Sequence, residues 1–133
     1  MSRSLLFLLL GFLFCISAAP ARAEKRVALV IGISKYHRVP QLSNPAHDAE
    51  AMGALFRKAG FDVVDEKRDL GIVDLRRVVR EFSEKAQDAD IAVVYYAGHG
   101  IEVDGLNYLV PADAKLVRDF DVEDEAVDRK SVV

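Results

Sequence analysis

Three short apolar runs, separated by two segments with helical periodicity, constrain the fold of this chain more than any other feature. Residues 26–33 (RVALVIGI) and 91–96 (IAVVYY) are almost continuously apolar, which is typical of strands covered on both faces of a parallel sheet. Residues 61–64 (FDVV) have the length and composition of another strand. Between these runs, apolar side chains recur at helical spacing in residues 45–59 and 75–86. This alternation predicts a right-handed, doubly wound α/β sheet.

Helix-end and turn signals agree with this assignment. Asn44 and Pro45 have the residue types of a helix N-cap and a first helical position, and Gly60 suits a helix end. Asp104-Gly105 lies between two short alternating segments and predicts a hairpin turn.

The third apolar run ends at a histidine between two glycines. In parallel sheets ligands bind beyond the carboxyl ends of the strands, so residues 34–43 and 97–100 should meet at one edge. His99 suits proton transfer because imidazole titrates near neutral pH. Gly98 and Gly100 allow unusual backbone angles, and the Gly100 N–H suits a developing oxyanion. These residues predict a catalytic role for His99; a turn with an incidental surface histidine is the alternative.

Five segments occur in the order and with the spacing of a known family. The chain resembles the caspase-like cysteine peptidases, specifically the bacterial metacaspase-like members, in RVALVIGISKY, LSNPAHDAEAM, LFRKAGFDV, DIAVVYYAGHG and NYLVPADA. The resemblance covers residues 26–114. It implies a caspase-like three-layer α/β/α fold with a mainly parallel sheet, and hydrolysis of peptide bonds by a Cys-His pair.

The resemblance also implies roles for individual residues. His99 matches the family's catalytic histidine, and Gly100 matches the residue whose backbone N–H helps to form the oxyanion hole. Asp48 matches the aspartate that lines the pocket for a basic residue before the scissile bond, so the expected substrate is a peptide or protein cut after Arg or Lys. A favourable charge in the first turn of a helix is the structural alternative for Asp48. His47 departs from the family pattern, which has Asn at this position.

The nucleophile of the family mechanism is missing from this sequence. None of the 34 residues after His99 is a cysteine, and the single cysteine of the chain, Cys15, lies near its start. Ser34 has no nucleophile motif around it, and Ser83 falls on a predicted helix away from the site edge. We therefore expect a fold truncated before the strand that carries the nucleophile, and an N-terminal fragment of an endopeptidase that is inactive alone.

The N-terminus has the pattern of a secretory signal. Arg3 supplies the positive charge, residues 5–16 are apolar, and Ala21 and Ala23 are the small residues that a signal peptidase requires. The apolar stretch is shorter than the roughly 20 residues of a membrane-spanning helix. We predict a signal peptide at 1–23, a partial peptidase domain at 24–114, an acidic segment at 115–133, and a secreted or periplasmic mature protein.

Composition excludes several kinds of function. Removal of residues 1–23 takes two of the 18 basic residues and none of the 21 acidic ones, and this acidic excess argues against nucleic acid or anionic membranes as partners. The mature chain would hold no cysteine and hence no disulfide. His37, His47 and His99 lack the spacing of a metal-ligand pair, so we expect no metal and no cofactor. The six carboxylates in residues 119–128 lack the pattern of a calcium-binding loop and suggest a solvated linker.

Two further readings compete with the peptidase fragment. One is a non-catalytic caspase-like module that binds partners or peptides in the cell envelope. The other is an unrelated α/β domain of the receiver or flavodoxin type, which lacks support because the sequence has neither the acidic cluster of a receiver nor a glycine-rich phosphate loop.

Overall fold

The fold is built around a parallel sheet of three strands. The computed structural model describes residues 24–116 and 121–132. Strand β1 (Arg26–Gly32) lies at the centre of the sheet, between β2 (Val63–Arg68) and β3 (Ile91–Ala97). Both neighbours run parallel to β1, so all three carboxyl ends meet at the same edge.

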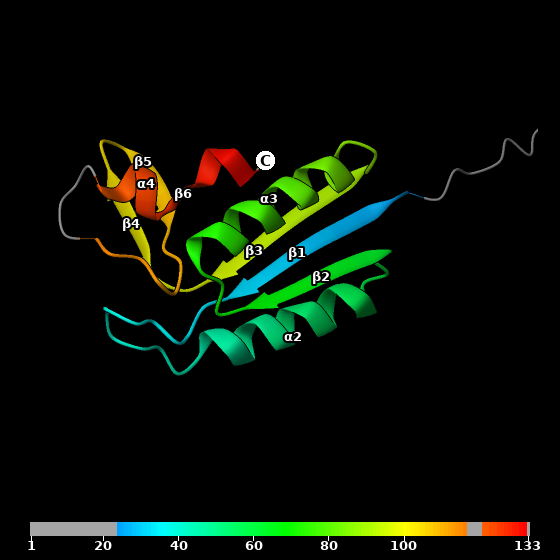
Figure 1. Cartoon of the computed structure of the whole chain (residues 1–133). Helices are drawn as coiled ribbons and strands as arrows, with labels where there is room; N and C mark the ends of the chain where they lie inside the picture. The colour runs from blue at the N-terminus through cyan, green and yellow to red at the C-terminus, as the bar shows by residue number, and fades with distance from the viewer. Residues whose placement is uncertain (1–23, 117–120, 133) are drawn as a thin grey trace, which may run out of the picture.

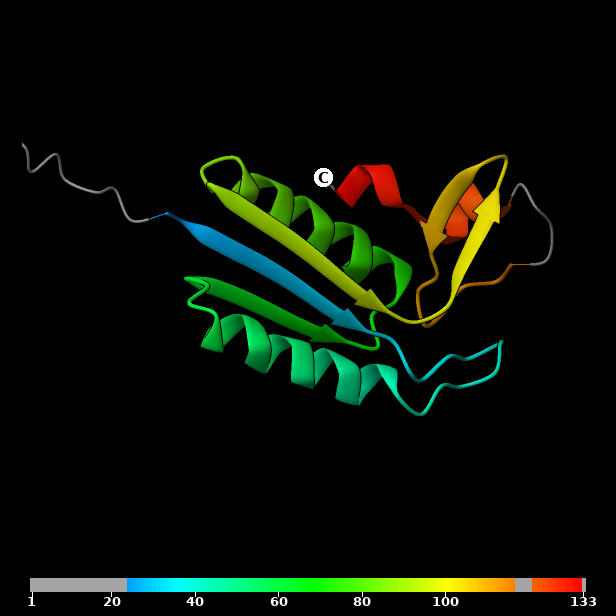
Figure 2. The ribbon, with the colours of Figure 1, turned by 180° about the vertical axis from the view of Figure 1, so that it is seen from behind.

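The two long helices cover opposite faces of this sheet. Helix α2 (Pro45–Lys58) connects β1 to β2 on one face, and helix α3 (Ile72–Ala86) connects β2 to β3 on the other (Figure 1). Figure 2 shows the same three layers from behind. This arrangement confirms the doubly wound α/β sheet expected from the sequence and is consistent with a caspase-like fold.

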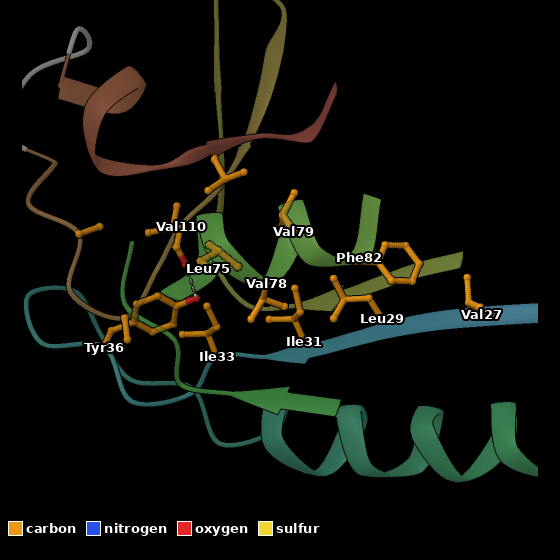
Figure 3. Close-up of a cluster of buried hydrophobic side chains, with 13 residues drawn as sticks. Val27, Leu29, Ile31, Ile33, Tyr36, Leu75, Val78, Val79, Phe82 and Val110 are labelled. Atoms are coloured by element: carbon orange, nitrogen blue, oxygen red, sulfur yellow. Dashed lines mark hydrogen bonds between the residues drawn. The ribbon is translucent and has the colours of Figure 1, made fainter. Parts of the chain in front are cut away.

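The main apolar core lies between β1 and α3 (Figure 3). Every residue of β1 after Arg26 is buried, as the unbroken apolar run predicts for a central parallel strand. Helix α3 turns one apolar stripe toward β1, while its charged residues face outward. The stripe consists of Leu75, Val78, Val79 and Phe82.

A second, smaller sheet lies beyond the carboxyl ends of the parallel strands (Figure 1). Its strands β4 (Gly100–Val103) and β5 (Leu106–Leu109) form an antiparallel hairpin. Asp104 and Gly105 both have positive φ, 51° and 74°, which confirms the predicted hairpin turn.

Part of the acidic C-terminal segment is folded against this hairpin, in contrast to the solvated linker that we expected. A short helix α4 (Val122–Glu125) precedes β6 (Val127–Asp128), which pairs with β5, and a 3-10 helix η2 (Arg129–Val132) follows. Val122 and Ala126 are buried in a small cluster with Tyr108. The apolar residues that anchor this segment are isolated between carboxylates, so they left no periodic signal in the sequence.

Strand β2 extends further than the apolar residues 61–64 suggested. It begins at Val63 and continues through charged residues to Arg68. These charges are accommodated because Glu66 forms ion pairs with Arg57 and Arg68, at 3.1 and 2.8 Å. Hydrophobic patterning alone therefore misplaced this edge strand.

The N–H groups in the first turns of the two long helices donate to acceptors from distant segments. Asn44 occupies the predicted N-cap position of α2, but its side chain makes no capping hydrogen bond. Instead the Ser34 hydroxyl accepts a hydrogen bond from the Ala46 N–H, at 3.1 Å. For α3, the carboxylate of Asp113 accepts from the Ile72 N–H at 2.8 Å. The helix end at Gly60 was predicted correctly, since this residue has a φ of 81°.

No helix within residues 24–116 and 121–132 is long and apolar enough to span a membrane. The predicted signal peptide, residues 1–23, lies outside the described residues.

Candidate active site

The loop after β1 and the end of β3 lie together at the carboxyl edge of the sheet, as predicted. Pairing of the two strands continues past their ends, because the Ile33 N–H donates to the Ala97 carbonyl at 2.9 Å. Tyr36, in the loop after β1, packs its ring against the ring of His99, with centroids 4.6 Å apart.

The imidazole of His99 is held by a backbone carbonyl of the same loop. Its Nε2 lies 2.8 Å from the carbonyl oxygen of Pro40. A carbonyl only accepts hydrogen bonds, so Nε2 must carry a proton in this arrangement. In the neutral ring Nδ1 then holds the lone pair, which is the state of a general base. His99 is half-buried and does not belong to the apolar core.

The backbone of His99 is held by two tyrosine hydroxyls. The His99 N–H donates to the Tyr36 hydroxyl at 2.7 Å, and the His99 carbonyl accepts from the Tyr96 hydroxyl at 2.8 Å. That carbonyl also accepts from the Val110 N–H at 3.1 Å. Burial raises the pKa of both tyrosines above the ordinary value of 10, so both hydroxyls remain protonated at neutral pH.

The flanking glycines allow unusual backbone angles but do not use the left-handed ones. Within the described residues, the glycines with positive φ are Gly60 and Gly105. Gly98 is required for a different reason, since a Cβ there would lie 2.6 Å from the hydroxyls of both Tyr36 and Tyr96. A Cβ at Gly100 would meet only the Tyr108 carbonyl, at an ordinary 3.6 Å.

A carboxylate at the end of β2 fixes the loop that carries Tyr36 and Pro40. The Asp69 side chain accepts hydrogen bonds from the N–H groups of Ser34 and Lys35, at 2.8 and 2.9 Å. Asp69 has a φ of 49°, and its own N–H donates to the Gly32 carbonyl at 3.0 Å. All three strands of the parallel sheet thus contribute to the position of His99.

Asp48 lies beside this edge, on the first turn of α2, and is exposed. Together with residues 42–45 and 95–98 it lines a cavity of about 370 Å³. Gly98 belongs to this lining and directly precedes His99, so the cavity adjoins the histidine.

The other candidates lie away from a catalytic arrangement. Ser34 is buried and accepts the α2 capping hydrogen bond, while the Ser83 hydroxyl donates to the Val79 carbonyl within α3. His37 and His47 are exposed. No group of three or more His, Cys, Asp or Glu side chains able to hold a metal ion occurs in the described part of the chain.

Sequence reasoning found His99 and the loop beside it but missed three of the groups that hold it. The Pro40 carbonyl has no side-chain signature that could have revealed it. Tyr36 and Tyr96 read as ordinary aromatic residues next to apolar runs. The signal that was available is the place of each tyrosine, within four residues of a strand end at the predicted site edge.

Comparison with known proteins matches the family that the motifs suggested. The caspase domain family matches residues 25–130. The human mucosa-associated lymphoid tissue lymphoma translocation protein 1 is 37% identical over 92 residues, which are 69% of this chain and 11% of that protein. The mouse homologue is 36% identical over 92 residues, which are again 69% of this chain and 11% of that protein. This chain therefore spans about a tenth of the length of these relatives. The matched family, the shared identity and the α/β sheet agree, and the chain belongs to the caspase domain family of peptidases.

Proposed function

We propose that this chain carries the histidine half of a caspase-like cysteine endopeptidase site, with His99 as general base and then general acid. The observation that supports this most directly is the hydrogen bond between His99 Nε2 and the Pro40 carbonyl. It leaves Nδ1 of the neutral ring free to take a proton, at the edge where α/β sheets bind ligands.

The chemistry requires a thiol from outside residues 24–133, which contain no cysteine. In the proposed reaction His99 Nδ1 accepts the thiol proton, and the thiolate attacks the substrate carbonyl. The tetrahedral oxyanion is stabilised by the Gly100 N–H, and collapse of the intermediate breaks the C–N bond as His99 returns the proton to the amine. Water then hydrolyses the acyl-enzyme and frees the acid and the thiol.

We propose that Asp48 selects a basic residue before the scissile bond. Its carboxylate lines the cavity next to His99 and is exposed to an incoming side chain. A guanidinium or ammonium group in this cavity would form a charge-assisted hydrogen bond, which is stronger than a neutral one.

Binding of a small basic ligand tests the role of Asp48 without any peptide cleavage. We expect acetyl-arginine amide to shift the NMR signals of the cavity residues more strongly than acetyl-citrulline amide, its neutral analogue. Asp48→Asn should weaken the binding of the arginine ligand by about tenfold, the effect of losing one charge-assisted bond. Glu50→Gln, a matched change on the exposed side of α2, should leave binding unchanged. Equal binding of both ligands would refute the assignment.

The peptidase itself is tested by the coding sequence beyond Val133. We expect the 133-residue chain to cleave no Arg or Lys peptide substrate, and a longer product that continues into a strand with an Asp-x-Cys block to cleave them. His99→Ala in that product should reduce kcat by at least about a hundredfold, because proton transfer is lost. Cleavage by the 133-residue chain that His99→Ala abolishes would contradict the missing nucleophile. A continuation without such a block would favour a non-catalytic module that binds peptides or partners in the cell envelope.

We also propose that the protein is exported, on the basis of the signal pattern in residues 1–23. N-terminal sequencing of the exported protein should begin at Glu24. Retention of residues 1–23 in the mature protein would contradict this proposal.

A further inference from the structure

The two tyrosines that surround the His99 backbone form one hydrogen-bonded unit. Their hydroxyl oxygens lie 3.2 Å apart, and both lie within hydrogen-bond distance of the Val110 carbonyl, at 3.3 Å from Tyr36 and 2.9 Å from Tyr96. Tyr36 follows β1 and Tyr96 belongs to β3, so the unit joins two strands at the site edge. Both hydroxyls are directed at the short segment that carries His99.

The donors and acceptors of the two hydrogen bonds between this unit and the His99 backbone can be assigned. The backbone N–H of His99 only donates, so the Tyr36 oxygen must accept from it and can then donate its single proton to Tyr96 or Val110. The Tyr96 proton is in turn available to the His99 carbonyl, its closest acceptor at 2.8 Å. Each hydroxyl supplies one proton. Removal of the Tyr36 hydroxyl would take a partner from the His99 N–H, and removal of the Tyr96 hydroxyl would take one from the His99 carbonyl.

The space for these hydroxyls is provided by the missing side chain of Gly98. A Cβ at this position would approach each hydroxyl to 2.6 Å and the Cζ atom of Tyr96 to 2.8 Å. These atoms belong to rigid tyrosine side chains with few rotamers, so the contact cannot be relieved by a small movement of a flexible chain end. The tyrosine pair can therefore form only with glycine at position 98.

The same loop reaches His99 at two points. Tyr36 packs against the imidazole ring and its hydroxyl accepts from the backbone N–H, while the carbonyl of Pro40, four residues later, binds Nε2. If the Pro40 carbonyl were the only contact, the imidazole would still move whenever the His99 backbone moved. The tyrosine pair restrains the backbone, so the two sets of contacts together define where Nδ1 lies.

We propose that Tyr36 and Tyr96 are positioning residues for His99, which hold its peptide group so that the imidazole remains on the Pro40 carbonyl. This inference deepens the proposed function and rests on it, because the group being positioned is the base of that reaction.

The test reads the histidine ring itself by NMR, in the 133-residue chain and without a substrate. We expect a slowly exchanging Nε2–H signal from His99 and a protected His99 backbone amide. Tyr36→Phe should abolish the Nε2–H signal and speed exchange of the amide by about tenfold, the effect of losing one net hydrogen bond. Tyr96→Phe should weaken the Nε2–H signal less, because the His99 carbonyl keeps the Val110 N–H as a donor.

Matched variants separate positioning from a loss of folding. Tyr108→Phe removes a hydroxyl from another buried tyrosine and should leave both His99 signals intact, and exchange of the Leu29 amide in the core should stay slow in every variant. If Tyr36→Phe does not fold, Gly98→Ala keeps both hydroxyls but displaces them and should have the same effect on His99. Folded variants of either kind that retain both His99 signals would overturn the proposal. Because cleavage is not measured, an inactive longer protein would refute the peptidase while leaving this positioning intact.

Discussion

Glu66 shows how a single residue accommodates charge in an edge strand. Its side chain is 18% exposed and lies between the guanidinium groups of Arg57 and Arg68. The hydrogen bond from Arg68, the largest effect, together with that from Arg57 lowers the pKa of the carboxyl below its ordinary value of 4.5. A lowered carboxyl pKa means that the folded chain binds a proton less readily than the unfolded chain, so this interaction stabilises the fold only when Glu66 is ionised.

The pH dependence follows from this sign. The stabilisation is complete above pH 4.5, the ordinary pKa, and disappears as the pH falls through the lower pKa of the folded state. We expect the Tm of the wild-type chain to fall more steeply across this range than the Tm of Glu66→Gln, which cannot titrate. Thermal melts at a series of pH values measure the difference. Glu81→Gln, which removes a half-exposed partner of Arg77, should follow the wild-type curve, and parallel curves for Glu66→Gln would contradict the assignment.

At the scale of elements, α3 depends on a residue far along the chain. Gly71 occupies its N-cap position and has no side chain to bind the first turn. Asp113 supplies the acceptor for the Ile72 N–H, and a Cβ at Gly71 would lie 2.7 Å from that carboxylate. The helix that covers the main core is thus tied to the segment that follows β5.

Removal of this acceptor should destabilise the whole domain. We expect Asp113→Ala to lower the free energy of unfolding by about 1 kcal/mol, the usual effect of losing a capping side chain. Asp113→Asn keeps an acceptor oxygen and should cost clearly less. Urea denaturation measures both, and hydrogen exchange of the first turn of α3 localises the effect. Equal losses for Ala and Asn would show that the carboxylate charge, rather than the hydrogen bond, stabilises this helix end.

The same elements show what a sequence can and cannot predict. The order of strands and helices follows from β1, α3 and β3, because the two strands are continuous apolar runs and α3 has apolar residues at helical spacing on one buried face. The start of α2 at Pro45 also followed from the sequence. The groups that cap the two long helices did not follow, because Ser34 and Asp113 act across long sequence separations that local patterns do not contain. For the site, the position of His99 at a strand end was predictable, whereas its Pro40 partner was not, since every residue has a carbonyl.

At the scale of the molecule, the two edges of the parallel sheet differ in charge. Strand β2 has four charged residues at one edge, which is the usual protection against pairing with another chain. Strand β3 has none over its seven residues, and within the described part of the chain no strand pairs with its outer side. An apolar cavity of about 580 Å³ runs beside this strand, between it and α3. An uncharged open edge of this kind favours association.

We therefore expect the isolated 133-residue chain to self-associate with increasing concentration. Ala92→Lys places a charge on the exposed start of β3 and should shift the chain toward monomer. Ala54→Lys adds the same charge on the exposed surface of α2 and should leave the association unchanged. Sedimentation velocity distinguishes these outcomes, and a wild-type chain that stays monomeric at all concentrations would contradict the prediction.

The pairing of β1 with β3 has a consequence for any partly folded form of the protein. Ile31 is opposite Tyr96 and Gly32 is opposite Ala97, and in this alignment the hydroxyls of Tyr36 and Tyr96 both contact the His99 backbone. A slip of one residue would turn Tyr96 to the opposite face of the sheet and separate its hydroxyl from Tyr36. A misaligned sheet would thus leave the His99 backbone without its tyrosine contacts, so the correct strand register is a precondition for an ordered histidine.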